Sequence, residues 1–83
     1  MKIKELLSLF RLSSEVKAVY LFRAKAYPVP QNDNIRYEDR FEHPLRSRTQ
    51  TLTNLQDLSM IEDGEIESMW VNGKMLMIRE NGC

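Results

Sequence analysis

The sequence feature that most constrains the fold is the segment from Glu65 to Glu80, which predicts a β-hairpin. Two runs rich in apolar and β-branched residues are separated here by Asn72 and Gly73. Asn followed by Gly accepts a positive φ at both central positions, as a type I′ turn requires, and the twist of that turn matches the twist of the flanking strands. We therefore expect two antiparallel strands that turn at Asn72 and Gly73.

A two-residue turn also fixes which residues of the hairpin share a face. With Asn72 and Gly73 as the loop, Val71 opposes Lys74 and Trp70 opposes Met75. A hairpin at a protein surface has one apolar and one polar face, whereas each face here has four apolar residues, so both are expected to be covered. The two apolar sets are Ile66, Trp70, Met75 and Met77 on one face and Met69, Val71, Leu76 and Ile78 on the other.

The face that carries Trp70 has two interpretations, and the sequence leaves both open. In the first, the hairpin is the centre of the core and Trp70 is buried. In the second, this face binds another protein or a second copy of the chain, because methionine and tryptophan are both enriched at binding surfaces. The candidate partner-binding residues are Ile66, Trp70, Met75 and Met77.

The N-terminal segment, residues 2–12, predicts a short amphipathic helix. Apolar residues recur at helical spacing, at Ile3, Leu6, Leu7 and Phe10, with charged residues between them. About ten residues are too few for a helix that is stable in isolation, so this helix must pack its apolar side on the rest of the domain.

Residues 16–27 alternate in the manner of a strand. Val16, Ala18 and Tyr20 lie on one side and Lys17 and Val19 on the other, and the pattern continues to Pro28. A second helix is the competing interpretation, since Ser14 can serve as its N-cap and alanine favours helix. The β-branched and aromatic residues favour the strand.

The middle of the chain predicts three weaker elements. Residues 35–41 alternate as an exposed strand that lies at a sheet edge or carries a bulge. Residues 45–53 predict a polar strand with little to bury, or a loop. Residues 54–60 have leucines at helical spacing and predict one or two helical turns, with Thr51 or Thr53 as the cap.

Together these elements predict an α+β fold in one small domain spanning residues 1–83. A short N-terminal helix packs on a four- or five-stranded antiparallel sheet that ends in a type I′ β-hairpin. If residues 16–27 are helical, the domain instead has two helices on a three-stranded sheet. A chain of 83 residues buries only about 60% of the surface that its unfolded state exposes, so the core is small.

Residues that carry chemistry are sparse. His43 is the only histidine, Cys83 the only cysteine, and the three glycines are too dispersed to hold a phosphate. We therefore expect no enzymatic activity, no cofactor and no metal. A single cysteine forms no intramolecular disulfide and fits a reducing cytoplasm, and the sequence has no apolar run of about 18 residues that would span a membrane.

The distribution of charged residues along the chain indicates an alternative function. The net charge is zero, but residues 1–50 contain ten basic and six acidic residues. Lys17, Arg23 and Lys25 share one side of the first predicted strand, and Arg46 and Arg48 follow, so a nucleic-acid-binding module is the alternative. The neutral chain argues against it. The favoured hypothesis is a small, non-enzymatic interaction or regulatory protein of the cytoplasm that binds another protein or a second copy of itself.

Overall fold

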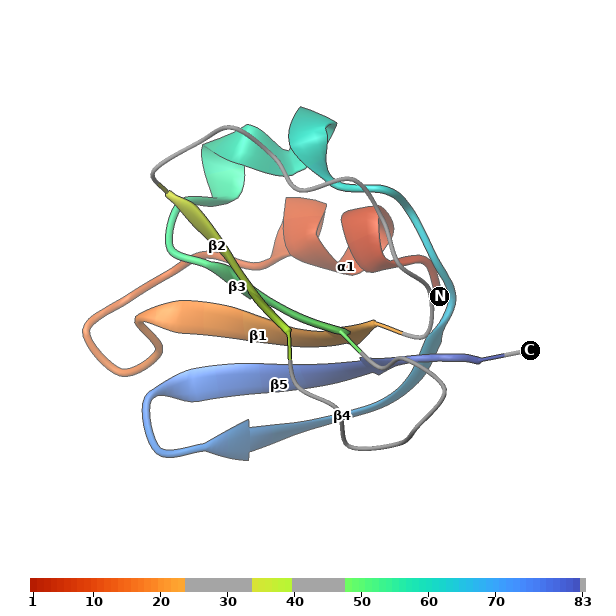
Figure 1. The fold of residues 1–83 in the computed structure, drawn as a ribbon. Coiled ribbons are helices and arrows are strands. Elements are labelled where there is room, and N and C mark those ends of the chain that lie inside the picture. Colours follow the sequence, from red (N-terminus) through yellow and green to blue (C-terminus); the bar gives the residue numbers. More distant parts are fainter. Residues whose placement is uncertain (24–33, 40–47, 83) are drawn as a thin grey trace.

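The computed structural model of this chain describes residues 1–23, 34–39 and 48–82. None of the helices in these ranges is long and apolar enough to cross a membrane. Figure 1 shows the elements in chain order: α1 (Ile3–Leu9), β1 (Ala18–Arg23), β2 (Ile35–Asp39), β3 (Arg48–Leu52), the 3-10 helix η1 (Leu55–Met60), β4 (Ile66–Asn72) and β5 (Met75–Glu80).

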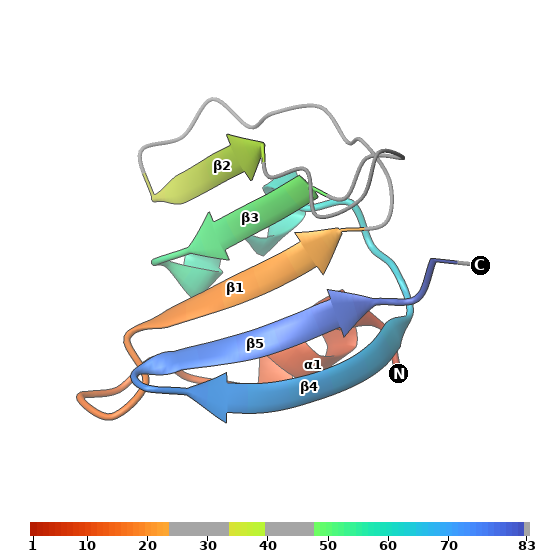
Figure 2. The same ribbon diagram turned by 60° about the horizontal axis from the view of Figure 1, so that its bottom comes forward.

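The five strands form one sheet in the order β2-β3-β1-β5-β4 (Figure 2). Strand β1 pairs with β3 in the antiparallel sense and with β5 in the parallel sense, so the sheet is mixed. The prediction of an α+β fold with a short N-terminal helix is confirmed, but the prediction of a purely antiparallel sheet is wrong. The reason is topological: after β3 the chain crosses to the far edge, and the β4–β5 hairpin then brings β5 back beside β1.

The helices lie on one side of the sheet, α1 behind β5 and β4 and η1 behind β3 in the view of Figure 2. Ile3 and Leu7 of α1 are buried against the central strands. Helix α1 ends earlier than predicted, because Phe10 already has an extended backbone. The buried apolar core consists of Ile3, Leu7, Val19, Leu21, Ile35, Leu52, Ile61, Leu76 and Ile78.

The predicted strand at residues 16–27 is confirmed over Ala18–Arg23, and residues 24–27 lie outside the described part of the chain. Strand β2 lies at an edge, as predicted. Strand β3 is paired on both sides, so Thr49 and Gln50 are buried and the expectation of little to bury there is wrong.

The predicted helical turns before the hairpin are confirmed as η1. Their cap differs from the predicted threonines: the side chain of Asn54 accepts a hydrogen bond from the backbone N–H of Gln56, at 3.0 Å. A side-chain oxygen at this position satisfies a backbone donor that the helix itself leaves free.

The β4–β5 hairpin is antiparallel as predicted, but it turns one residue later. Asn72 opposes Met75 and the loop is Gly73–Lys74, so Trp70 opposes Met77 rather than Met75. Gly73 has a φ of 61°, the left-handed conformation that glycine adopts without a steric penalty. A shift of one residue at the turn moves each cross-strand partner by two, so Trp70, Met75 and Met77 still share a face.

A β-bulge near the start of β4 changes the face of Ile66. Ile66 opposes Glu80 whereas Ser68 opposes Arg79, so Glu67 is an extra residue in the strand. The extra residue turns Ile66 to the helix side, where it packs against the core cluster. The prediction that Ile66 shares a face with Trp70 is therefore wrong, and burial of an apolar side chain is the physical reason.

Candidate functional site: the open face of the sheet

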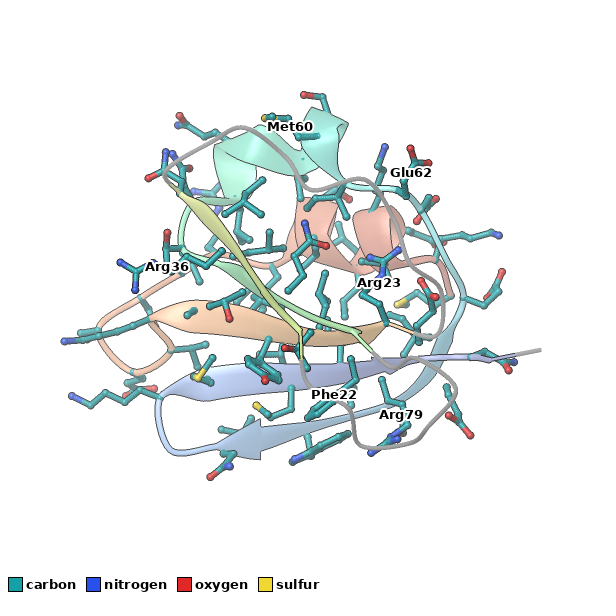
Figure 3. All side chains as sticks on the ribbon, in the orientation of Figure 1. Phe22, Arg23, Arg36, Met60, Glu62 and Arg79 are labelled. Atoms are coloured by element: carbon teal, nitrogen blue, oxygen red, sulfur yellow. The ribbon has the colours of Figure 1, made fainter. Side chains whose placement is uncertain are left out.

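The sheet face opposite α1 and η1 carries a cluster of aromatic, methionine and arginine side chains, which we call the open face. No helix or strand in the described ranges lies over it (Figures 1 and 2). Figure 3 shows Phe22 and Arg79 on this side of the sheet and Arg23 on the opposite side, toward Glu62. Its central residues are Tyr20 and Phe22 of β1, Met75, Met77 and Arg79 of β5, and Trp70 of β4.

Phe22 contacts two other aromatic rings on the open face, one on the same strand and one on β4. Phe22 and Trp70 stack with ring centroids 5.7 Å apart and an interplanar angle of 19°. Tyr20 meets Phe22 edge-on, with centroids 5.0 Å apart. Strand β5 lies between β1 and β4, so the Phe22–Trp70 stack bridges two strands that do not pair directly.

The guanidinium of Arg79 contacts both stacked rings. Its Cζ atom lies 5.2 Å from the ring centroid of Phe22 and 5.9 Å from that of Trp70, within the range of cation–π attraction. Arg79 itself is exposed, and it forms no ion pair with any residue that the structure describes. Its N–H donors are thus held in a fixed place and remain available to a carboxylate.

Burial on the open face falls from the centre toward the β4 edge. Tyr20 and Met77 are buried, Phe22 and Met75 are half-buried, and Trp70 is 38% exposed. Trp70 is therefore not a buried core residue, as the first interpretation expected. Its ring packs on Phe22 and still presents apolar surface to solvent.

Of the predicted partner-binding residues, the structure brings Trp70, Met75 and Met77 together on the open face and places Ile66 on the other side. Residues that the sequence reasoning missed are Tyr20, Phe22 and Arg79. Alternation in residues 16–27 does place Tyr20 and Phe22 on one side of a strand, but no local pattern indicates that β1 lies beside β5.

Of the predicted basic residues, the structure describes the side chains of Lys17 and Arg23. Lys17 is exposed, whereas Arg23 is almost fully buried. Lys25 and Arg46 lie outside the described residues, as does the side chain of Arg48. The side of β1 that was expected to be a basic surface is the side that faces the core, since Val19 and Leu21 alternate with Arg23 there.

Arg23 is instead half of a buried ion pair. Its Nη2 atom lies 2.7 Å from Oε2 of Glu80 and also donates to the backbone carbonyl of Glu62, at 2.6 Å. A buried arginine needs such partners because an unpaired charge in the interior is strongly destabilising. This pair connects β1, β5 and the segment that leads into β4, and it is not accessible to a ligand.

A shallow pocket of about 230 Å³ lies between the end of α1 and the start of η1, lined by Phe10, Arg11, Leu12, Thr53, Asn54, Leu55 and Gln56. Among the side chains that the structure describes within residues 1–23, 34–39 and 48–82, no three of His, Cys, Asp or Glu lie close enough together to hold a metal ion. His43 and Cys83 are outside these ranges.

No protein-family model, curated protein or solved structure matches this chain.

Proposed function

We propose that this protein is a small, non-enzymatic interaction module that binds another protein through the open face of its sheet. The observation that carries the proposal is the stack of half-buried Phe22 and exposed Trp70 with Arg79 over both rings. Tryptophan, tyrosine and arginine are the residues that most often dominate binding energy at protein interfaces, and methionine is enriched there too. With a single cysteine in the chain, we place this function in the reducing cytoplasm.

The geometry favours a partner that is apolar and carries a carboxylate. Trp70 and half-buried Met75 offer apolar surface, and Arg79 offers donors in a planar fork that suits a carboxylate. Because both rings already hold the guanidinium in place, little side-chain freedom is lost when a partner binds, which favours affinity.

A partner protein is favoured over nucleic acid for two reasons. The faces of the Phe22 and Trp70 rings that lie against each other are not free to stack on bases. Arg23, one of the residues expected to contact phosphate, is buried in its pair with Glu80, and the neutral chain supplies no general attraction for a polyanion.

The test is a selection of binders from a displayed random-peptide library on the wild-type protein. Selected peptides are then labelled and titrated, with fluorescence polarisation as the readout. We expect apolar peptides that contain Asp or Glu. Trp70→Ala and Arg79→Glu should each weaken binding by at least about tenfold, as substitutions at interface hot spots do. Circular dichroism checks that both variants are folded.

Lys17→Glu is the matched control, because it makes the same change of charge at an exposed residue outside the cluster. It should leave peptide binding unchanged. Short single-stranded oligonucleotides are titrated in parallel over a salt series. Peptide binding that neither Trp70→Ala nor Arg79→Glu affects would overturn the proposal. So would tight oligonucleotide binding that falls steeply with salt and is weakened by Lys17→Glu.

A further inference from the structure

We propose that the outer edge of β4 pairs with the β4 edge of a second copy of this chain, in an antiparallel register centred on Trp70. The two five-stranded sheets then become one continuous sheet. This inference rests on the backbone edge of the sheet, whereas the proposed binding of another protein rests on side chains of the open face. Trp70 belongs to both surfaces.

Strand β4 is an edge strand that is exposed on both faces. The exposed fractions of Met69, Trp70 and Val71 are 52%, 38% and 63%. Natural edge strands are usually protected by charges, prolines or bulges. In β4 the bulge and the one charge are both at Glu67, so residues 68–72 form an unprotected edge with neither charge nor proline.

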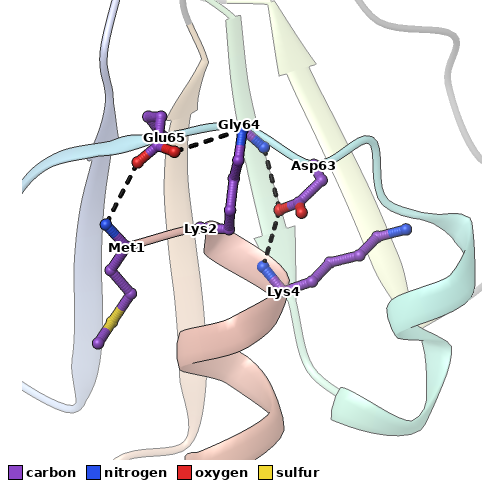
Figure 4. Close-up of polar contacts among 6 residues, drawn as sticks. All are labelled: Met1, Lys2, Lys4, Asp63, Gly64 and Glu65. Atoms are coloured by element: carbon purple, nitrogen blue, oxygen red, sulfur yellow. Dashed lines mark hydrogen bonds and ion pairs between the residues drawn. The ribbon is translucent and has the colours of Figure 1, made fainter.

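The start of this edge already receives an extended segment of the chain itself. Lys2 forms an antiparallel bridge with Glu65, and the N–H of Ile66 donates to the carbonyl of Met1 at 3.0 Å. Figure 4 shows Met1 and Lys2 beside Glu65. The edge therefore accepts a strand in the antiparallel direction, and beyond Ile66 no described residue covers it.

The hairpin register shows which backbone groups point outward. Asn72 and Met75 flank the two-residue loop, and residues in that position exchange backbone hydrogen bonds with each other. Trp70, two residues away, likewise directs its N–H and C=O toward β5. Met69 and Val71 direct theirs to the outer edge, where they are free to bond to another strand.

A two-fold axis through Trp70 places the outward N–H and C=O groups of one copy opposite the equivalent groups of the second copy. Met69 then opposes Val71 of the second copy, and the two Trp70 residues face each other on the open face, with Cα atoms about 4.5 Å apart as in a non-hydrogen-bonded pair. Glu67 then comes opposite the loop residue Gly73 of the second copy, next in sequence to Lys74, and this proximity of unlike charges, which occurs twice by symmetry, is favourable. A parallel arrangement would align Glu67 with itself.

The test is the mass of the full chain in solution, measured by light scattering over a wide range of protein concentration. Reductant is present so that Cys83 forms no disulfide. We expect the mass to rise from one chain to two. Met69→Pro removes an outward N–H and leaves the β4–β5 hydrogen bonds intact, so this variant should remain a monomer. Val71→Lys, which adds an edge charge without a backbone change, should do the same.

Charge variants test the orientation. Glu67→Lys should weaken the dimer, and the double variant Glu67→Lys/Lys74→Glu should restore it. Arg79→Glu changes the open face but not the edge, so it should weaken the proposed peptide binding and leave the dimer intact. A wild-type mass of one chain at every concentration would overturn the pairing while leaving the open-face proposal standing. A dimer that withstands Met69→Pro and Val71→Lys would also overturn it.

Discussion

Arg23 of β1 and Glu80 of β5 form an ion pair inside the protein, with 2.7 Å between Nη2 and Oε2 and side-chain exposures of 0% and 3%. The two residues come at the ends of neighbouring parallel strands, one position beyond the Phe22–Arg79 pair. The same guanidinium nitrogen donates to the carbonyl of Glu62. Arg23 thus connects β1 to β5 and to the segment that leads into β4.

Removal of one partner of this pair should destabilise the protein strongly. In Glu80→Gln the buried charge of Arg23 loses the carboxylate beside it, and breaking a buried ion pair in this way typically costs about 3–5 kcal/mol. Urea unfolding of the variants measures the free energy of unfolding. The exposed ion pair of Lys2 and Glu65 serves as the control, since Lys2→Ala should lower the free energy of unfolding far less.

The double variant Arg23→Met/Glu80→Leu distinguishes the pair from two independent residues. It removes both charges and keeps apolar volume, so it should be more stable than either Arg23→Met or Glu80→Leu alone. If the effects of the two single substitutions simply add in the double variant, the two side chains are not coupled.

We predict that the position of the Glu80 side chain requires glycine at residue 64. A Cβ atom at residue 64 would lie 2.8 Å from Cδ of Glu80 and closer still to its Oε2, and Arg23 holds this carboxylate in place. We expect Gly64→Ala to cost about 1–3 kcal/mol, as overpacking does. In a Glu80→Ala background the obstacle is gone, so the same change at Gly64 should cost clearly less. An equal cost in both backgrounds, measured by urea unfolding, would contradict this explanation.

Local sequence patterns predicted the elements of this fold well. Helical spacing around Ile3 and Leu7, alternation in residues 16–27 and the Asn72–Gly73 signal each describe neighbouring residues, and each corresponds to an element in the structure. The same patterns contain no information on which strands become neighbours. The parallel pairing of β1 with β5 therefore could not be predicted, and neither could the contact between Phe22 and Trp70.

Two predictions about individual residues are wrong because neither a distant ion-pair partner nor a β-bulge is visible in a local sequence pattern. Arg23 was expected on a solvated basic surface because its type is usually exposed, yet the structure supplies a buried carboxylate from a strand that is distant in sequence. Ile66 was expected beside Trp70 because strict alternation assumes a regular strand, and the bulge at Glu67 breaks that alternation. The ion-pair partner thus determines the position of Arg23, and the bulge determines that of Ile66.

Acid should weaken the attachment of the N-terminal segment to Glu65. The amino group of Met1 and then the ammonium of Lys2, at 3.2 and 3.3 Å, hold the pKa of Glu65 below the usual glutamate value of 4.5 (Figure 4). Because the folded-state pKa is lowered, the stabilisation is complete above pH 4.5 and is lost as the pH falls through the pKa of the folded state. The group is exposed, so the effect is small.

NMR titration of the Glu65 carboxyl carbon measures this pKa directly. Acetylation of the Met1 amino group should raise the pKa of Glu65 more than Lys2→Ala does, since the amino group is the larger cause. The stability difference between wild type and Glu65→Gln should also shrink at acid pH. A Glu65 pKa that neither modification changes would show that these contacts are not maintained in solution.

The loop residue Gly73 should resist replacement by ordinary residues for a reason of backbone conformation alone. Its φ is 61°, and no atom lies within 4 Å of the position of an added Cβ. Any loss of stability in Gly73→Ala therefore reports the left-handed backbone, at about 1–2 kcal/mol. Gly73→Asn should cost less, because asparagine tolerates this conformation. Urea unfolding ranks the variants, and a Gly73→Ala protein as stable as wild type would mean that the loop is not Gly73–Lys74.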